Sequence, residues 1–133
     1  MYIRILKKED YQLFMNLHNM SIPQDKFNEL YDDIFKAAII FVIELDNKLV
    51  GMAKLLIEQK FIHNLSKYGH IEDVYVDPDY RNNNYGKLLI KHMVDYCKER
   101  SFFKITLTCN EQVAPFYEKN GFEIYNLHMS QLL

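Results

Sequence analysis

Apolar residues recur along the chain with two different spacings. In some segments they alternate with polar residues or form short continuous runs, which favours strands, and in others they recur every three or four residues, which favours amphipathic helices. The strand-like segments are residues 2–6, 38–45, 49–58, 70–76, 103–109 and 122–132. The helix-like segments are residues 9–20, 25–36, 87–100 and 111–120. This order predicts one mixed α/β (α+β) domain over residues 1–133, with a sheet of about six strands flanked by about four helices.

Short segments between these elements predict how they connect. Residues 46–48, Asp-Asn-Lys, join two apolar segments and predict a β-hairpin. Residues 60–68 predict an ordered loop that contains the apolar Phe61, Ile62 and Leu65. Gly121 directly follows the last helix-like segment, where a glycine can adopt the left-handed conformation that ends a helix. We therefore expect that helix to end at residue 120.

The composition is that of a globular protein without a broad charged surface. Of the 133 residues, 49% are hydrophobic and 26% are charged, and the net charge is −2. This balance gives no general attraction to nucleic acid or to an acidic membrane, so any anion site must be local. The longest apolar run, residues 37–43, is far shorter than the roughly 18 residues that span a bilayer. With no signal-peptide pattern and only two cysteines, Cys97 and Cys109, we expect a cytoplasmic protein in a reducing compartment.

Residues 69–87 contain the strongest candidate chemistry. The strand-like part of this segment ends at Pro78, because proline cannot donate a hydrogen bond to a sheet. Residues 82–84, Asn-Asn-Asn, tolerate left-handed backbone angles directly before a helix-like segment. A loop of this kind points several N–H groups at one place, which predicts an anion site at the helix N-terminus. Taken alone, the same residues also fit a polar surface turn with an N-cap.

The loop resembles a motif of a known family. Residues 81–86 read Arg-x-x-Asn-x-Gly and resemble the pyrophosphate-binding loop of the Gcn5-related N-acetyltransferases (GNAT), whose pattern is Gln/Arg-x-x-Gly-x-Gly/Ala. Asn84 stands where the family has its first glycine, and asparagine is the next best residue for a positive φ. The predicted order of strands and helices is also that of a GNAT domain, so the resemblance covers essentially the whole chain.

Two further blocks resemble one branch of that superfamily, the glucosamine 6-phosphate N-acetyltransferases. The first joins Glu-Gln-Lys-Phe-Ile-His at residues 58–63 to Gly-His-Ile-Glu-Asp-Val at residues 69–74. The second is Phe-Tyr-Glu-Lys-Asn-Gly-Phe at residues 116–122. The loop at residues 81–86 lies between these two blocks, at the interval expected for this branch. The three motifs together indicate the branch more specifically than any one of them does. The resemblance implies an acyltransferase that uses acetyl-CoA as a co-substrate.

On the acetyl-CoA side, the resemblance implies main-chain and side-chain contacts. The backbone of Val74, Tyr75 and Val76 would pair with the pantetheine arm as an added strand does. The pyrophosphate would be held by Arg81, Asn82, Asn83, Asn84, Tyr85, Gly86 and Lys87. Tyr117, with Glu118 and Lys119 beside it, would lie at the sulfur, where a phenol can protonate the leaving thiolate. Without the resemblance, residues 74–76 also fit ordinary core sheet, and Tyr117 also fits a core aromatic residue.

On the sugar side, the resemblance implies that Glu72 and Asp73 contact the substrate, with Glu72 also a candidate catalytic residue. We expect their side chains on opposite faces of the sheet, with Glu72 on the same face as His70 and Val74, because strand residues alternate. The other predicted substrate-binding residues are Lys60, Phe61, Ile62, His63, Val74, Phe103, Lys104 and Thr108. Each lysine also fits a solvated surface residue, and Asp73 also fits a polar sheet rim.

Two departures from this branch fall on the sugar side. Where its pattern is Leu-Asp-Cys, this chain has Leu-Thr-Cys at residues 107–109, and a threonine hydroxyl cannot act as a base near neutral pH. The late arginine that meets the phosphate in that branch has no counterpart in residues 130–133, Ser-Gln-Leu-Leu. An amine beside an anomeric carbon is less basic than a lysine, so Glu72, His63 or a water chain could carry the proton. Alternatively, the substrate is another amino sugar or small amine.

These features predict direct acetyl transfer in a ternary complex from acetyl-CoA to the 2-amino group of glucosamine 6-phosphate. The product would be N-acetylglucosamine 6-phosphate, for UDP-GlcNAc biosynthesis. The alternatives are transfer to another small amine and a non-catalytic CoA-binding module. The resemblance also implies a homodimer whose C-terminal strands cross between subunits. The five histidines lack metal-ligand spacing, so we expect no metal, and we expect no nucleic-acid or membrane partner.

Overall fold

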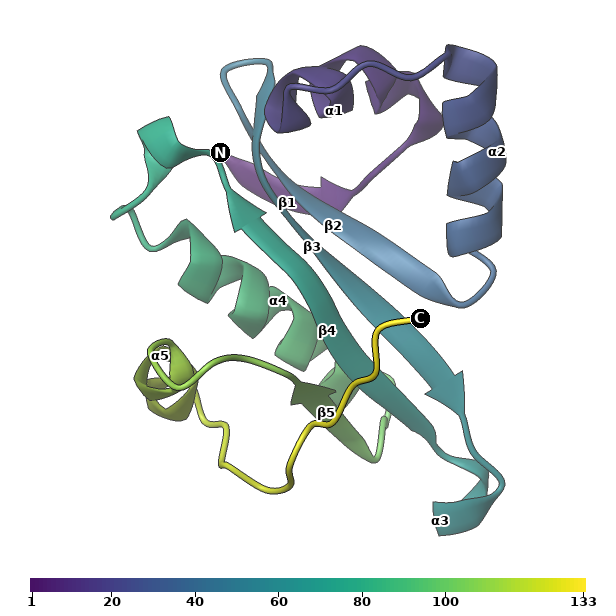
Figure 1. Ribbon diagram of the computed structural model, residues 1–133, viewed down its shortest axis with the longest axis vertical. Helices are drawn as coiled ribbons and strands as arrows, with labels where there is room; N and C mark the ends of the chain where they lie inside the picture. The colour runs from purple at the N-terminus through teal and green to yellow at the C-terminus, as the bar shows by residue number, and fades with distance from the viewer.

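Five strands form one mixed sheet in the computed structural model, which describes residues 1–133 (Figure 1). The strands are β1 (Tyr2–Ile5), β2 (Ala38–Leu45), β3 (Lys48–Gln59), β4 (Lys67–Val76) and β5 (Lys104–Leu107). They lie in the sheet in chain order. The first four are antiparallel to their neighbours, whereas β5 is parallel to β4. A parallel pair needs a crossover, and helix α4 (Tyr85–Glu99) provides it.

The helices cover both faces of the sheet. Besides α4, they are α1 (Tyr11–His18), α2 (Gln24–Ile34), α3 (Ile62–Leu65) and α5 (Ala114–Lys119). Two short 3₁₀ helices, η1 (Lys8–Asp10) and η2 (Pro78–Tyr80), precede α1 and follow β4. Figure 1 shows α1 and α2 together over one end of the sheet, with α4 and α5 on the other side. None of these helices is long and apolar enough to cross a membrane.

Two separate cores result from this layering. On one face, Phe41 of β2 packs with Leu89 and Met93 of α4. On the other face, the neighbouring Val42 packs in a cluster with Phe27 of α2. The nearly continuous apolar run of β2 follows from burial on both faces, as in sheets with helices on each side.

Several predicted connections are confirmed. The segments 38–45 and 49–58 form the β2–β3 hairpin. Gly121 has a φ of 93°, in the left-handed region. The N–H of Gly121 donates to the carbonyl of Glu118, and the N–H of Phe122 donates to that of Tyr117. These two bonds are the pair that ends a helix in a Schellman motif, so α5 ends as predicted.

The predicted sixth strand at residues 122–132 is wrong, and the sheet has five strands. A strand needs a neighbour, and no strand of the same chain pairs with this segment. The helices number five rather than about four, because α3 lies inside the segment predicted as a loop. His63, Asn64 and Leu65 have φ values of 51°, 60° and 59°, so α3 contains left-handed residues. Sequence pattern does not reveal such a turn, because non-glycine residues seldom adopt it.

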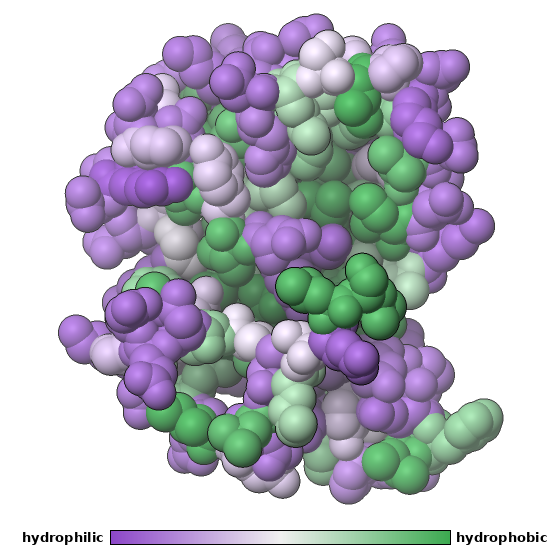
Figure 2. Space-filling model, in the orientation of Figure 1, coloured by the Kyte–Doolittle hydropathy of each residue, from purple (hydrophilic) through white to green (hydrophobic).

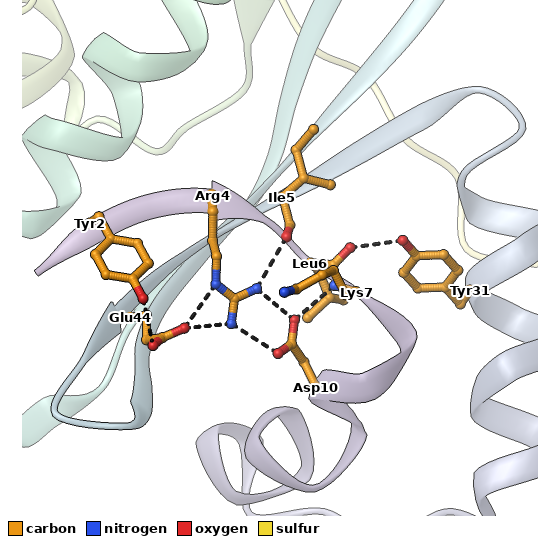
Figure 3. A network of polar contacts seen from close by, with 8 residues as sticks. All are labelled: Tyr2, Arg4, Ile5, Leu6, Lys7, Asp10, Tyr31 and Glu44. Atoms are coloured by element: carbon orange, nitrogen blue, oxygen red, sulfur yellow. Dashed lines mark hydrogen bonds and ion pairs between the residues drawn. The ribbon is translucent and has the colours of Figure 1, made fainter.

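An ion-pair network ties β1 to η1 and to β2 (Figure 3). The guanidinium of Arg4 donates to both carboxylate oxygens of Asp10, at 2.7 and 2.9 Å, and also to Glu44 at 2.8 Å. Burial alone would raise the pKa of Asp10, but the hydrogen bonds from Arg4 and from the N–H of Lys7 lower the pKa overall. The network holds the first strand against the second at the edge of the sheet.

Candidate active site

β4 and β5 pair over only part of their length, which leaves an opening in the sheet. The last paired residues are Ile71 and Leu107. Beyond them β5 ends, whereas β4 continues to Val76. Backbone groups of residues 72–76 on that edge therefore have no neighbouring strand. An extended ligand can add to such a free edge as a strand does.

A β-bulge in β4 lies at this opening. Opposite the single residue Ala53 of β3, β4 has two residues, Asp73 and Val74. Asp73 has a φ of 55°, a left-handed angle that aspartate tolerates better than most residues. The extra residue shifts by one position the alternation of side chains between the two faces of the sheet. Val74 therefore packs against the core on the α4 side, and the next residue, Tyr75, packs against the core on the opposite side.

The bulge places Glu72 and Asp73 on the same face of the sheet, so our expectation of opposite faces is wrong. Ile71 is buried on the α4 side, and its neighbour Glu72 points to the other face. Asp73 reaches that same face, where its Oδ2 lies 2.9 Å from the Nζ of Lys54. Val74 lies on the α4 side and does not share a face with Glu72. Both carboxylates are exposed beside the opening.

A groove of about 680 Å³ runs from this edge of β4 to the start of α4 and to α5. Its charged lining residues are Arg81, Lys87 and Lys119, with no acidic residue among them. The groove therefore has a local positive charge although the chain has a net charge of −2. The predicted cofactor residues in its lining are Val74, Tyr75, Val76, Arg81, Asn82, Asn84, Tyr85, Gly86, Lys87 and Lys119. Four other residues of the lining were not predicted from the sequence: Tyr80, Val113, Phe116 and Asn120.

Three predicted cofactor residues, Asn83, Tyr117 and Glu118, lie outside this lining. The side chain of Asn83 donates to the carbonyls of Tyr80 and Arg81, so it shapes the loop. Asn82 and Asn84 have φ values of 66° and 63°, which are the left-handed angles that the asparagine run predicts.

The start of α4 presents free N–H groups to the groove. The N–H groups of residues 85–87 have no backbone acceptor, as expected for the first turn of a helix. Asn84 is the N-cap but makes no side-chain capping hydrogen bond, and the first turn contains no acidic residue. Unpaired N–H groups and the positive end of the helix dipole both favour a bound anion here.

Tyr117 lies on α5 beside the groove. It is half-buried, packs against the core on the α4 side and contacts Phe116 and Phe122 edge to face. Burial raises the pKa of its phenol, and the nearby Cys109 raises it further. The phenol is therefore protonated at neutral pH and can donate a proton.

The predicted substrate residues form two groups along β4. Glu72, Asp73 and Val74 lie at the bulge, with Thr108 directly after β5. The other group surrounds Tyr68 near the start of β4, and its members are Lys60, His63, Phe103 and Lys104. Glu72 is the fourth residue after Tyr68 along the strand, which is about 13 Å away at 3.3 Å per residue.

The group around Tyr68 combines two cations with stacked rings. The Nζ atoms of Lys60 and Lys104 lie 4.8 and 5.0 Å from the centre of the Tyr68 ring. The ring of His63 stacks on Phe103 with centroids 3.8 Å apart. Two other predicted substrate residues, Phe61 and Ile62, are exposed and make no stacking contact in the chain.

A strip of polar side chains connects the two groups on the face opposite α4. The Nδ1 of His70 lies 2.5 Å from the hydroxyl oxygen of Thr106, and its Nε2 lies 3.0 Å from a carboxylate oxygen of Glu58. Glu58 also pairs with Lys60 at 3.0 Å. Hydrogen bonds from His70 and Lys60 lower the pKa of Glu58, so it stays ionised. From the sequence we expected His70 on the same face as Glu72, but the sequence did not predict the strip.

Two residues near the bulge were missed altogether. His18 on α1 contacts Tyr75 with the two rings tilted by 37° and their centroids 5.2 Å apart, and Lys54 on β3 pairs with Asp73. In the sequence, His18 shares the apolar spacing of its helix, and Lys54 stands in an apolar strand. A charged residue within such a strand is the one signal that could have identified Lys54.

Known proteins with similar sequences support an acetyltransferase site in this groove. The family described as "Acetyltransferase (GNAT) family" matches residues 7–122. The glucosamine 6-phosphate N-acetyltransferase of Arabidopsis thaliana is 33% identical over 116 residues, which are 84% of this chain and 78% of the relative. The enzyme of that name from Trypanosoma brucei brucei is 38% identical over 90 residues, or 68% of this chain and 61% of the relative.

Solved structures show the same fold. The crystal structure of glucosamine-6-phosphate N-acetyltransferase from Arabidopsis thaliana superposes with a TM-score of 0.89 at 31% identity. The match covers 98% of this chain and 97% of that one. The family match covers most of the chain, and the opening between β4 and β5 and the groove at the start of α4 are consistent with it. The chain therefore belongs to the GNAT acetyltransferase family.

Proposed function

We propose that the protein transfers an acetyl group from acetyl-CoA to the 2-amino group of glucosamine 6-phosphate. One observation carries the acetyl-CoA part of this proposal. The free edge of β4 leads directly into a groove whose charged lining residues are all cations. An extended pantetheine arm can pair with residues 74–76, and the diphosphate can then meet Arg81, Lys87 and the free N–H groups of α4.

The identity of the acceptor rests on relatives and on the polar face of the sheet. The relatives that match over most of the chain are named glucosamine 6-phosphate N-acetyltransferases. Two exposed carboxylates, Glu72 and Asp73, lie at the bulge beside the opening, and they can attract a positively charged amine to a thioester bound there. The ammonium groups of Lys60 and Lys104, together near Tyr68, supply positive charge for a phosphate.

The proposed chemistry is direct attack in a ternary complex. The amine nitrogen adds to the thioester carbonyl, whose oxygen takes the electron pair and can accept a hydrogen bond from the free edge of β4. The tetrahedral intermediate then expels the thiolate of CoA, and Tyr117 donates a proton to it. Cys109 is exposed and Cys97 is buried, with a thiol pKa raised to about 11, so neither thiol is arranged as an acyl carrier.

We further propose a homodimer assembled through the C-terminal segment. Residues 125–130 alternate Tyr-Asn-Leu-His-Met-Ser, and Tyr125, Leu127 and Met129 are each at least 80% exposed. Figure 2 shows apolar side chains in the region where Figure 1 draws this segment. An alternating segment without a strand partner in its own chain can pair with a second copy. We place the reaction in the cytoplasm, since both cysteines are free thiols, as in a reducing compartment.

Thiol release from acetyl-CoA tests the proposed function. Purified protein is given glucosamine 6-phosphate, unphosphorylated glucosamine or a polyamine, and free thiol is measured over time. We expect release with glucosamine 6-phosphate at a rate far above that with the other amines. Release with another amine instead would move the activity to a different acceptor. Binding of acetyl-CoA without release with any amine would identify a non-catalytic CoA-binding module.

A further inference from the structure

Acetylation requires a group that takes a proton from the amine, and at the opening the exposed carboxylate of Glu72 is one candidate. Thr108, directly after β5, carries no base. His63 stacks on Phe103 at the far end of β4, five strand residues from the bulge, or about 17 Å along the strand. Another imidazole, that of His18, lies at the bulge itself.

The imidazole of His18 is held in one place by its neighbours. His18 is the last residue of α1, and its ring contacts Phe14 edge to face and meets the ring of Tyr75 on β4 at a tilt of 37°. Tyr75 is one of the residues at the free edge and lines the groove. The ring is therefore next to the strand on which the thioester would lie.

The contacts of this ring identify its free nitrogen. The Nε2 of His18 lies 3.0 Å from the sulfur of Met52. A thioether sulfur can only accept a hydrogen bond, so we infer that Nε2 carries the hydrogen. In the neutral imidazole, the lone pair is then on Nδ1, and this nitrogen has no hydrogen-bond partner in the chain.

The charges around the ring suit a base. Burial lowers the pKa of His18, which keeps it neutral near pH 7, and the carboxylate of Asp73 acts in the opposite direction. On the strands, Asp73 and its partner Lys54 lie on the face of the sheet that His18 contacts, and Glu72 lies on the same face. The guanidinium of Arg81, after η2, lies 5.7 Å from the centre of the Tyr75 ring. From the helices, the ring is in contact with Phe14, which packs on Phe27 of α2, and neither residue is charged. Asp73 can thus stabilise the imidazolium that forms.

We propose that His18 accepts the proton of the substrate amine at Nδ1, with Asp73 as its charge partner. This inference rests on the proposed function. The ammonium form of the sugar gives one proton to Nδ1 and becomes the neutral nucleophile. Its lone pair forms the C–N bond, and the carbonyl electron pair moves to oxygen. When the C–S bond breaks, Tyr117 protonates the sulfur and the phenol is restored by the second proton lost from nitrogen. His18 releases the first proton to solvent, so one proton is produced per acetyl group.

The test is the pH dependence of kcat for acetyl transfer to glucosamine 6-phosphate, which reports groups that titrate in the complex. We expect His18→Gln to lower kcat by about 100-fold, the lower end of what general acid–base catalysis contributes. Without a base, kcat should also keep rising with pH through neutrality instead of levelling off. The KM for acetyl-CoA should stay within about twofold, because His18 lies outside the lining of the groove.

Matched variants separate this role from a structural one. His92 on α4 is also half-buried, and burial also lowers its pKa, but it packs against Phe41 away from the groove. We expect His92→Gln to keep the wild-type profile. Asp73→Asn removes the carboxylate that raises the pKa of His18, so the acidic limb of kcat should move to lower pH. This shift can be measured even if His18→Gln does not fold.

Two outcomes would overturn the inference while the proposed function stands. One is a wild-type pH profile in a folded His18→Gln variant, with folding checked by acetyl-CoA binding. The other is loss of the acidic limb in Glu72→Gln but not in His18→Gln, which would make Glu72 the acceptor. A wild-type protein that releases no thiol with glucosamine 6-phosphate would instead contradict the proposed function.

Discussion

Tyr117 keeps its proton at neutral pH, because the ordinary pKa of a tyrosine is about 10 and burial raises the pKa of this phenol further. A thiolate that leaves beside this hydroxyl takes the proton, and a phenylalanine at the same place packs equally well but has no proton to give. We therefore predict that Tyr117→Phe lowers kcat by about 100-fold while the Kd for acetyl-CoA changes by less than about twofold. Steady-state kinetics and calorimetry measure the two quantities.

Tyr96 provides the control for this substitution. Tyr96 lies near the C-terminal end of α4, where its ring contacts Phe41 and Phe102. Tyr96→Phe therefore removes a hydroxyl that is away from the groove. Equal turnover in Tyr117→Phe and wild type would remove Tyr117 from the mechanism.

Short motifs predicted most of the loop residues that line the groove but only Lys119 of α5, because residues close in sequence form a recognisable pattern. They did not identify His18 or Lys54, because α1 and β3 bring these side chains to β4 only through packing. The orientation of Asp73 was also missed, since a bulge depends on register with the neighbouring strand.

Helix α4 illustrates how an element serves the groove. Gly86 lies in its first turn, where glycine weakens a helix, yet a Cβ there would meet only the ring of Phe116 at 3.9 Å. Protein packing therefore does not require glycine, and both residues line the groove. We infer that the missing side chain lets a ligand approach the backbone closely.

If a ligand approaches the backbone at Gly86, replacing this glycine should affect stability and binding in opposite directions. Gly86→Ala should leave the free energy of unfolding unchanged or raise it by up to about 1 kcal/mol. The same change should weaken acetyl-CoA binding about tenfold, or about 1.4 kcal/mol. Urea unfolding and calorimetry measure the two effects, with Glu99→Ala at the other end of α4 as the control. Unchanged affinity in Gly86→Ala would mean that no ligand approaches α4 at this point.

At the element scale, the periodicity predicted the hairpin, the order of elements and the end of α5. It could not predict that residues 122–132 lack a strand partner, because an alternating segment forms a strand only beside another one. It could not predict the left-handed residues of α3 either, since Leu65 is not of a type that favours this conformation, and His63 and Asn64 adopt it only in a minority of structures.

For the whole molecule, the exposed C-terminal segment predicts the assembly state. Leu127→Ser with Met129→Ser removes two exposed apolar side chains from this segment. We expect the intact chain to elute as a dimer. The double variant should form a weaker dimer, which dissociates at a higher protein concentration than the intact one, and light scattering after size exclusion measures this. Asn126→Ser with His128→Ser, on the alternate positions, is the control. A monomeric intact chain at high micromolar concentration would contradict the dimer.

The stability of the whole molecule should depend on pH through Arg4 and Asp10. Arg4→Met leaves the buried carboxylate of Asp10 unpaired, so we expect a loss of about 3 kcal/mol at pH 7. The pKa of Asp10 is lowered in the folded state, so its contribution is complete above the unfolded value of about 3.9 and is lost as pH falls below it. Urea unfolding should therefore show a smaller difference between variant and wild type near pH 3 than at pH 7. A difference that is independent of pH would show that the pair does not carry this effect.

A competition experiment tests whether the protein prefers a phosphorylated amino sugar as its acceptor. Glucosamine 6-phosphate and glucosamine are supplied together at equal concentration with acetyl-CoA, and the acetylated products are separated and quantified by mass spectrometry. The ratio of products then equals the ratio of kcat/KM values for the two amines. We predict at least about 100-fold more N-acetylglucosamine 6-phosphate, a difference of about 2.7 kcal/mol in transition-state binding. Equal yields of the two products would contradict the assignment of the acceptor.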